Sequence, residues 1–171
     1  KYDNDKSVGK ILITSSTLSS SKILEKIKFK KTIHQFYPID HAIFSRKFLD
    51  HWKPNIAIFL ESEIWPSMFK SIKNRNILLI LLNARITKRS FDRWSKFKEF
   101  SYSIFGLIDK AYSQNSETNH YLKRLNVKNI KSSLKNFKLP IVVKSDGLAA
   151  GKGVTICKTK KKALIDAKKI L

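Results

Sequence analysis

The stretch PNIAIFLESEIWP, residues 54–66, decides the fold of this chain. Its apolar run, 55–60, follows Pro54 and stops at two carboxylates one residue apart, Glu61 and Glu63. An apolar run of this length between a proline and a charged cluster predicts a strand buried on both faces of a parallel sheet. Because such sheets place their ligand crevices at the carboxyl ends of the strands, Glu61 and Glu63 are candidate binding residues.

Helix capping is a plainer explanation for the same two acids. Glu61 and Glu63 precede a predicted helix with Pro66 at an early position, and acids near a helix N-terminus favour its dipole. A role in the core is disfavoured, since a buried carboxylate without a partner is costly. The spacing alone leaves binding and capping both open.

Outward from this stretch, strand and helix patterns alternate along the chain. A second buried strand, 77–82, also ends in polar residues, beginning with Asn83 and Arg85. Further strands are predicted at 11–13, 32–37 and 110–114, and helices at 41–52, 66–73, 91–108 and 116–125. This alternation predicts an α/β fold with a Rossmann-like, doubly wound parallel sheet.

A hydroxyl-rich turn, Thr14–Ser21, joins the first strand to a helix that contains Ile23, Leu24 and Ile27. Hydroxyls and free N–H groups at a helix start bind an anion or a sugar, which makes Thr17 a candidate. Helix capping accounts for the same residues equally well.

Composition limits the classes of function. The 171 residues suffice for one ordinary domain, or for one domain and a fragment of another. The net charge of +22 suits an anionic partner. Because the lysines are spread over the whole chain and no nucleic-acid-binding motif accompanies them, we do not expect the partner to be a nucleic acid. An anionic substrate or a lipid head group would use the same field.

Three further features concern compartment and metals. Cys157 is the single cysteine, which rules out an internal disulfide and suits a reducing compartment. The apolar run 77–82 is far shorter than the roughly 20 residues that cross a bilayer, so no transmembrane segment is expected. His34, His41 and His51 lack metal-site spacing, and no metal ligand is predicted.

The C-terminal part has a different character. A strand predicted at 139–144 leads into a glycine-rich loop, 145–153, and then into Val154–Cys157. The loop departs from the P-loop and dinucleotide patterns. A hairpin with Lys152 at its tip would still lay N–H groups and an ammonium over phosphates, and a simple surface hairpin is the alternative.

Residues 11–130 resemble the N-terminal domain of the 3-deoxy-D-manno-octulosonic acid (Kdo) transferases, which add Kdo from CMP-Kdo to lipid A precursor. The resemblance rests on ordered motifs, which are the hydroxyl-rich turn at 14–21, HQFYPID at 34–40, FLDHWKP at 48–54, ESEIWP at 61–66 and NARITKRS at 83–90. It implies the N-terminal half of a GT-B glycosyltransferase of lipopolysaccharide biosynthesis.

The same resemblance implies roles for residues. Thr17, Glu61, Glu63 and Arg85 would bind the acceptor, one acid orienting the acceptor or the catalytic base and Arg85 pairing with phosphate. The family's base is a glutamate in a Ser-Val-Gly-Glu-type segment, which we do not equate with residues 7–10. We therefore expect no catalytic residue and no activity from the chain as given, no cofactor besides the donor CMP-Kdo, and a cytoplasmic location at the inner membrane of a Gram-negative bacterium.

Residues from about 134 to 171 are similar to another family, the phosphoribosylamine-glycine ligases of purine biosynthesis. The segment LPIVVKSDGLAAGKGVTI, 139–156, matches the start of their ATP-grasp module, which implies ATP-Mg binding by Lys144, Gly151, Lys152 and Gly153. We expect an acceptor domain at 1–130, a junction at 131–138 and an ATP-grasp fragment at 139–171. The alternative function is that of a ligase fragment.

Overall fold

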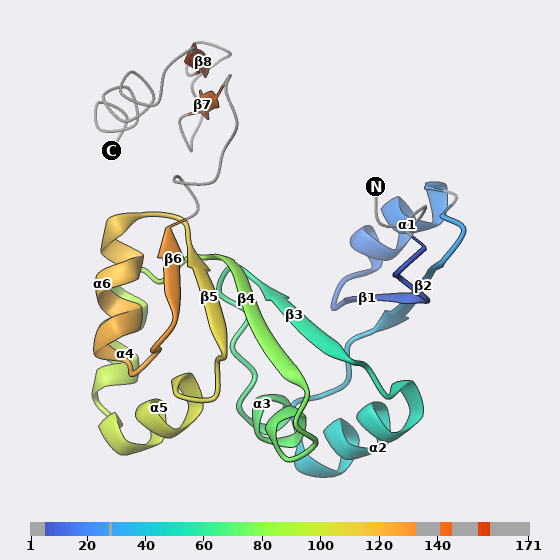
Figure 1. Cartoon of the computed structure of the whole chain (residues 1–171), viewed down its shortest axis with the longest axis horizontal. Helices are drawn as coiled ribbons and strands as arrows, with labels where there is room; N and C mark the ends of the chain where they lie inside the picture. Colours follow the sequence, from blue (N-terminus) through green and yellow to red (C-terminus); the bar gives the residue numbers. More distant parts are fainter. Residues whose placement is uncertain (1–5, 28, 133–140, 145–153, 158–171) are drawn as a thin grey trace. The chain divides into compact units, whose positions relative to one another are not determined.

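The computed structural model describes residues 6–27, 29–132, 141–144 and 154–157. The chain divides into two compact units, which we describe separately. The first comprises Lys1–Asn55 with Trp65–Asn76, and the second comprises Ile56–Ile64 with Ile77–Leu171. Figure 1 shows the elements in chain order.

The first unit contains a parallel pair of strands and three helices. Strand β1 (Ile11–Ser15) pairs with β2 (Thr32–Phe36), in a register from Ile11↔Thr32 to Ser15↔Phe36. Helix α1 (Leu18–Lys26) connects the two strands. Helices α2 (Ala42–Trp52) and α3 (Pro66–Lys73) pack against each other. The predicted strand–helix alternation is therefore confirmed in this half of the chain.

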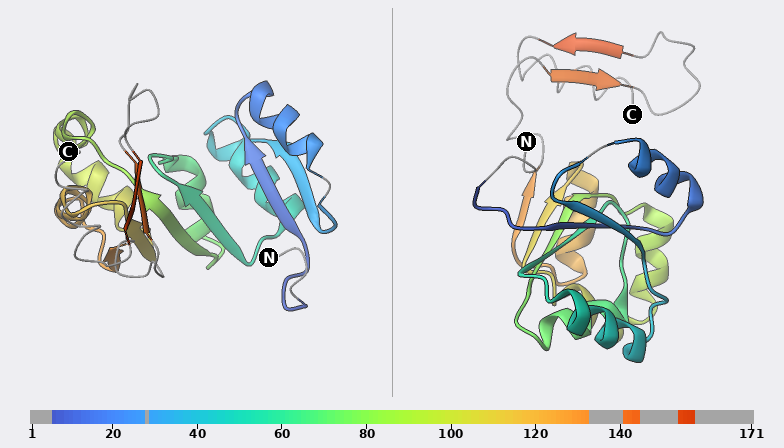
Figure 2. Two further views of the ribbon diagram at one scale, coloured as in Figure 1. Left: turned by 90° about the horizontal axis from the view of Figure 1, so that it is seen from above. Right: turned by 90° about the vertical axis from the view of Figure 1, so that its right-hand side faces the viewer.

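The second unit is built on a four-stranded parallel sheet. Its strands are β3 (Ile56–Leu60), β4 (Leu78–Ala84), β5 (Lys110–Ser113) and β6 (Ile130–Ser132), in the spatial order β3-β4-β5-β6. Helices α4 (Lys88–Ser95), α5 (Lys98–Phe105) and α6 (Ser116–Arg124) connect β4 to β5 and β5 to β6. Because parallel crossovers are right-handed and both advance in one direction, these helices share one face of the sheet, as Figure 2 shows.

The core of this unit lies between the sheet and that helical layer. Leu79 and Leu81 of β4 and Ala111 of β5 are at most 1% exposed, as are Phe105 and Leu122 of the helices. The α/β class with parallel sheets is thus as predicted. Strand β6 was not foreseen, because its three residues lie in a polar, lysine-rich stretch.

The prediction that the 55–60 strand is buried on both faces is wrong. Strand β3 is an edge strand, hydrogen-bonded in its sheet to β4, and its exposure alternates along the strand. Ile56, Ile58 and Leu60 are 52%, 54% and 56% exposed. Their partners Leu78, Ile80 and Leu82 point away from the buried Leu79 and Leu81, so this row of side chains lies on the face opposite the helical layer.

The long helix predicted at 91–108 is also wrong, since two helices replace it. The chain leaves helical geometry at Phe97, with φ −116° and ψ 62°, and the Ser101 hydroxyl bonds the carbonyl oxygens of Phe97 and Trp94 at the break. The Trp94 and Phe105 rings lie 5.2 Å apart. Eleven residues of continuous helix would separate them by about 16 Å, so the break lets the two rings pack against each other.

Beyond this unit's sheet, β7 (Ile141–Lys144) and β8 (Val154–Cys157) form an antiparallel hairpin, with Ile141 opposite Cys157. Both strands fall where strands were predicted. The intervening glycine-rich loop lies outside the described residues.

Candidate functional site

The two acids of the opening stretch lie at the carboxyl end of the four-stranded sheet. Leu60 at the end of β3 is in register with Leu82 of β4, so Glu61 and Asn83 follow at neighbouring positions. Both adopt the left-handed backbone conformation, with φ 54° at Glu61 and φ 50° at Asn83. Two adjacent strands therefore adopt the left-handed conformation at neighbouring positions, Glu61 just after β3 and Asn83 at the irregularity of β4 between Leu81 and Ala84, at the edge where α/β sheets bind ligands.

The left-handed conformation has a different cost at the two positions. Asparagine visits it readily, whereas a residue such as glutamate crowds its Cβ against the backbone at a cost of about 1–2 kcal/mol. Hydrogen bonds hold Glu61 in place, because its N–H donates to the Leu82 carbonyl at 2.9 Å and its carbonyl accepts from the Arg85 N–H at 3.3 Å. Strain of this kind persists where the surroundings over-determine it, and it concentrates at functional sites.

Ser62 completes the link between the two strand ends. Its hydroxyl donates to the Arg85 carbonyl at 2.6 Å, and the Glu63 N–H donates to the Leu60 carbonyl at 3.1 Å. Glu61, Ser62, Glu63 and Arg85 are all exposed. The structure thus brings together Glu61, Glu63 and Arg85, three of the four predicted acceptor residues. Together with Ser62 they form what we call the strand-end cluster.

Sequence reasoning missed Ser62. Its only signal was its position between the two acids, and a serine there is equally compatible with an ordinary turn.

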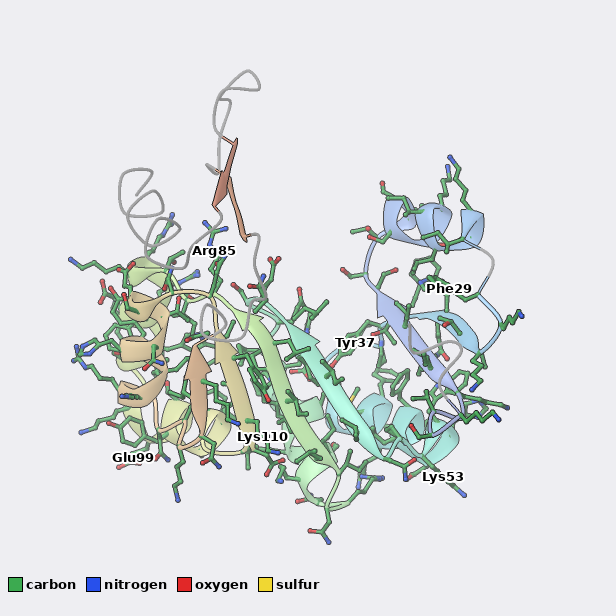
Figure 3. The ribbon with its side chains drawn as sticks, turned by 45° about the horizontal axis from the view of Figure 1, so that its top comes forward. Phe29, Tyr37, Lys53, Arg85, Glu99 and Lys110 are labelled. Atoms are coloured by element: carbon green, nitrogen blue, oxygen red, sulfur yellow. The ribbon has the colours of Figure 1, made fainter. Side chains whose placement is uncertain are left out.

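Positive charge gathers just beyond Arg85. Thr87 caps α4 by accepting from the Ser90 N–H at 3.2 Å, and the first turn then carries Lys88 and Arg89 with no acidic residue. Cations at a helix N-terminus oppose the helix dipole, so these two side chains do not serve the stability of α4. Together with Arg85, near the end of β4 in Figure 3, they favour an anion at this edge of the sheet.

The capping explanation for Glu61 and Glu63 is wrong. Helix α3 has Trp65 at its N-cap with no side-chain cap bond and no acidic residue in its first turn, although Pro66 does take the expected early position. Asp40 supplies the cap instead, its carboxylate accepting from the Ser67 N–H at 3.2 Å and the Met68 N–H at 2.9 Å. These are two of the N–H groups that a helix start leaves unpaired.

Thr17, the fourth predicted acceptor residue, lies in the first unit. It is the N-cap of α1, where its hydroxyl accepts from the Ser20 N–H at 3.3 Å and contacts the Ser20 hydroxyl at 2.9 Å. Its capping role is therefore established, and its part in an acceptor site stays a prediction.

The predicted ATP site is largely untested by the structure. Lys144 is the last residue of β7, whereas Gly151, Lys152 and Gly153 lie outside the described residues. Among the helices that the structure describes, none combines the length and apolar character needed to cross a membrane.

Comparison with known proteins identifies the family. A family model described as 3-deoxy-D-manno-octulosonic-acid transferase (kdotransferase) matches residues 2–140. The 3-deoxy-D-manno-octulosonic acid transferase of Rickettsia felis is 48% identical over 105 residues, which is 61% of this chain and 22% of that protein. The Rickettsia conorii enzyme of the same name is 39% identical over 138 residues, covering 77% of this chain and 29% of that protein.

A plant protein, the probable mitochondrial 3-deoxy-D-manno-octulosonic acid transferase of Arabidopsis thaliana, is 40% identical over 85 residues, half of this chain. The chain spans less than a third of the length of each of these relatives. The α/β fold with parallel sheets agrees with the N-terminal half of a GT-B glycosyltransferase.

Proposed function

The chain belongs to the 3-deoxy-D-manno-octulosonic-acid transferase family, and we propose that it forms the acceptor-binding part of an enzyme that transfers Kdo from CMP-Kdo to lipid A precursor. The acceptor is a phosphorylated sugar lipid, so its recognition needs hydrogen-bond acceptors for hydroxyls and cations for phosphate. The strand-end cluster and the cations after it offer both.

The acids and the cations divide this task. Glu61 and Glu63 are exposed acceptor groups suited to sugar hydroxyls, and one of them would orient the hydroxyl that attacks the donor sugar. Arg85 presents a planar fork that suits phosphate, and Lys88 and Arg89 add charge at the start of α4.

The single observation that carries the proposal is the left-handed backbone at Glu61, φ 54°. Glycine or asparagine would adopt this backbone conformation with less strain, so a glutamate at this position indicates that its carboxylate is needed there. Its hydrogen bonds to Leu82 and Arg85 fix the direction in which the side chain leaves the sheet.

Setting and partners follow from the proposed reaction. The acceptor would be met at the cytoplasmic face of the inner membrane of a Gram-negative bacterium, as a step of lipopolysaccharide biosynthesis. The formal net charge of +22 favours approach to an anionic lipid surface.

Retention on immobilised lipid A precursor tests the proposal. The chain should bind the phosphorylated matrix, and Arg85→Gln should weaken binding about tenfold, since a charge-assisted bond is worth about 1.5–3 kcal/mol. Arg93→Gln is the matched control, because it removes the same charge from the last turn of α4. Equal retention of both variants would contradict the role of Arg85.

For the C-terminal segment, ATP binding stays a separate prediction, supported by the β7–β8 hairpin that brackets the glycine-rich loop. ATP with Mg²⁺ should raise the melting temperature of the chain if Lys144 and the loop bind nucleotide. An unchanged melting temperature at millimolar ATP would contradict the hypothesis of a nucleotide-binding ligase fragment.

A further inference from the structure

A cavity of about 260 Å³ opens between the three helices of the second unit, away from the strand-end cluster. Its lining includes Phe91 and Ser95 of α4, Lys98, Ser101 and Tyr102 of α5, and Arg124 of α6. None of these residues belongs to the predicted acceptor site. Residues on both sides of the break between α4 and α5 line this cavity.

Two cations meet at this cavity, and aromatic rings hold both. The Arg124 guanidinium carbon lies 4.7 Å from the Phe91 ring centroid, and the Lys98 Nζ lies 5.5 Å from that of Tyr102. Phe91 is in turn stacked on Tyr121 at 4.5 Å. Contacts of this kind orient a cation while leaving its N–H groups available to a ligand.

One acid, Glu117, lies beside the ring stack that holds Arg124. Glu117 accepts a hydrogen bond from the Tyr121 hydroxyl at 2.7 Å, and this bond raises the pKa of Tyr121 above its ordinary value. Lys98 and Arg124 both line the cavity, and neither has an ion-pair partner among the described residues.

We propose that this cavity binds a phosphate monoester carried on a small sugar. A phosphate monoester dianion matches the two charges, the Arg124 fork suits its oxygens and the Ser95 hydroxyl adds a donor. The Tyr102 ring supplies an apolar wall for a sugar ring. The volume lies just below the range of about 300–1,000 Å³ that small-molecule sites occupy, which fits one phosphorylated monosaccharide.

Calorimetric titration of the whole chain at constant ionic strength tests this site. Inorganic phosphate should bind, glucose 6-phosphate should bind more tightly, and glucose should not bind. Lys98→Gln and Arg124→Gln should each weaken glucose 6-phosphate binding about tenfold. Lys123→Gln is the control, because it removes the same charge one position before Arg124 on α6 and does not line the cavity.

A second variant separates the cavity from general charge. Ser95→Phe keeps both cations but fills the space, so it should abolish binding while circular dichroism stays unchanged. Unaltered binding by Ser95→Phe, or an equal loss in Lys123→Gln, would overturn the proposal. Binding to phosphatidic acid vesicles without binding to glucose 6-phosphate would overturn it as well, since the phosphate would then come from a lipid.

Discussion

Glu61 places its carboxylate at the sheet edge by means of a backbone conformation that its side chain opposes. On the neighbouring strand Asn83 has the same left-handed backbone, but asparagine tolerates this conformation whereas glutamate does not. Glu61 thus combines a strained backbone with the proposed binding role.

Glu61→Gly should therefore stabilise the chain by about 1 kcal/mol, because glycine adopts φ 54° without strain. Urea denaturation measures the change. Asn83→Gly is the matched control and should gain less, since asparagine already accepts this conformation. A loss of stability in Glu61→Gly would show that the side chain serves the fold.

Asp40 is the acid that caps the start of α3. Asp40→Ala should lower the free energy of unfolding by about 0.5–2 kcal/mol, because the Ser67 and Met68 N–H groups lose their acceptor. Glu63→Ala, before the same helix, leaves the Asp40 cap in place and should therefore cost less. A reversed order of the two losses in thermal or urea unfolding would return the capping role to Glu63.

At the level of elements, the sequence predicted where most strands and helices lie, but not which strand is at the edge of the sheet or where a helix breaks. The run 77–82 is strongly apolar and became β4, but nothing in IAIFL distinguishes a central strand from an edge strand. That distinction depends on which strands pair, a long-range property. The helix break at Phe97 could not be predicted for a similar reason. The helical spacing of aromatic residues in 91–108 continues through the break, whereas the break depends on the tertiary packing of Trp94 against Phe100 and Phe105.

The contrast between β3 and β4 gives a matched pair of substitutions. Leu81→Ala, at a site 1% exposed, should cost about 2–5 kcal/mol through lost burial and a cavity. Ile58→Ala, at a site 54% exposed one register position away, should cost about 1 kcal/mol or less in the same urea series. Equal costs would mean that the outer face of β3 is covered in solution.

For the whole molecule, the sequence marks Glu61, Glu63 and Arg85 as candidates at the ends of two strands, and the structure places these two strand ends side by side. The hydrogen bond from Ser62 to Arg85 was beyond sequence reasoning, because it depends on the parallel register of β3 with β4. Thr17 belongs to a separate unit, so its part in the site stays a prediction from the sequence. The chain spans 22% of the length of its Rickettsia felis relative and 29% of that of its Rickettsia conorii relative.

The most direct test of the account is the dissociation constant for lipid A precursor measured on Glu61→Gln, Glu63→Gln and Glu99→Gln. Glu99 is an exposed acid of α5, and Figure 3 shows it far from Arg85 within the same unit. The account predicts that at least one of the first two variants binds about tenfold more weakly, the loss of one charge-assisted hydrogen bond, while Glu99→Gln binds as the unchanged chain does. Equal affinity in all three variants would contradict an acceptor site at the ends of β3 and β4.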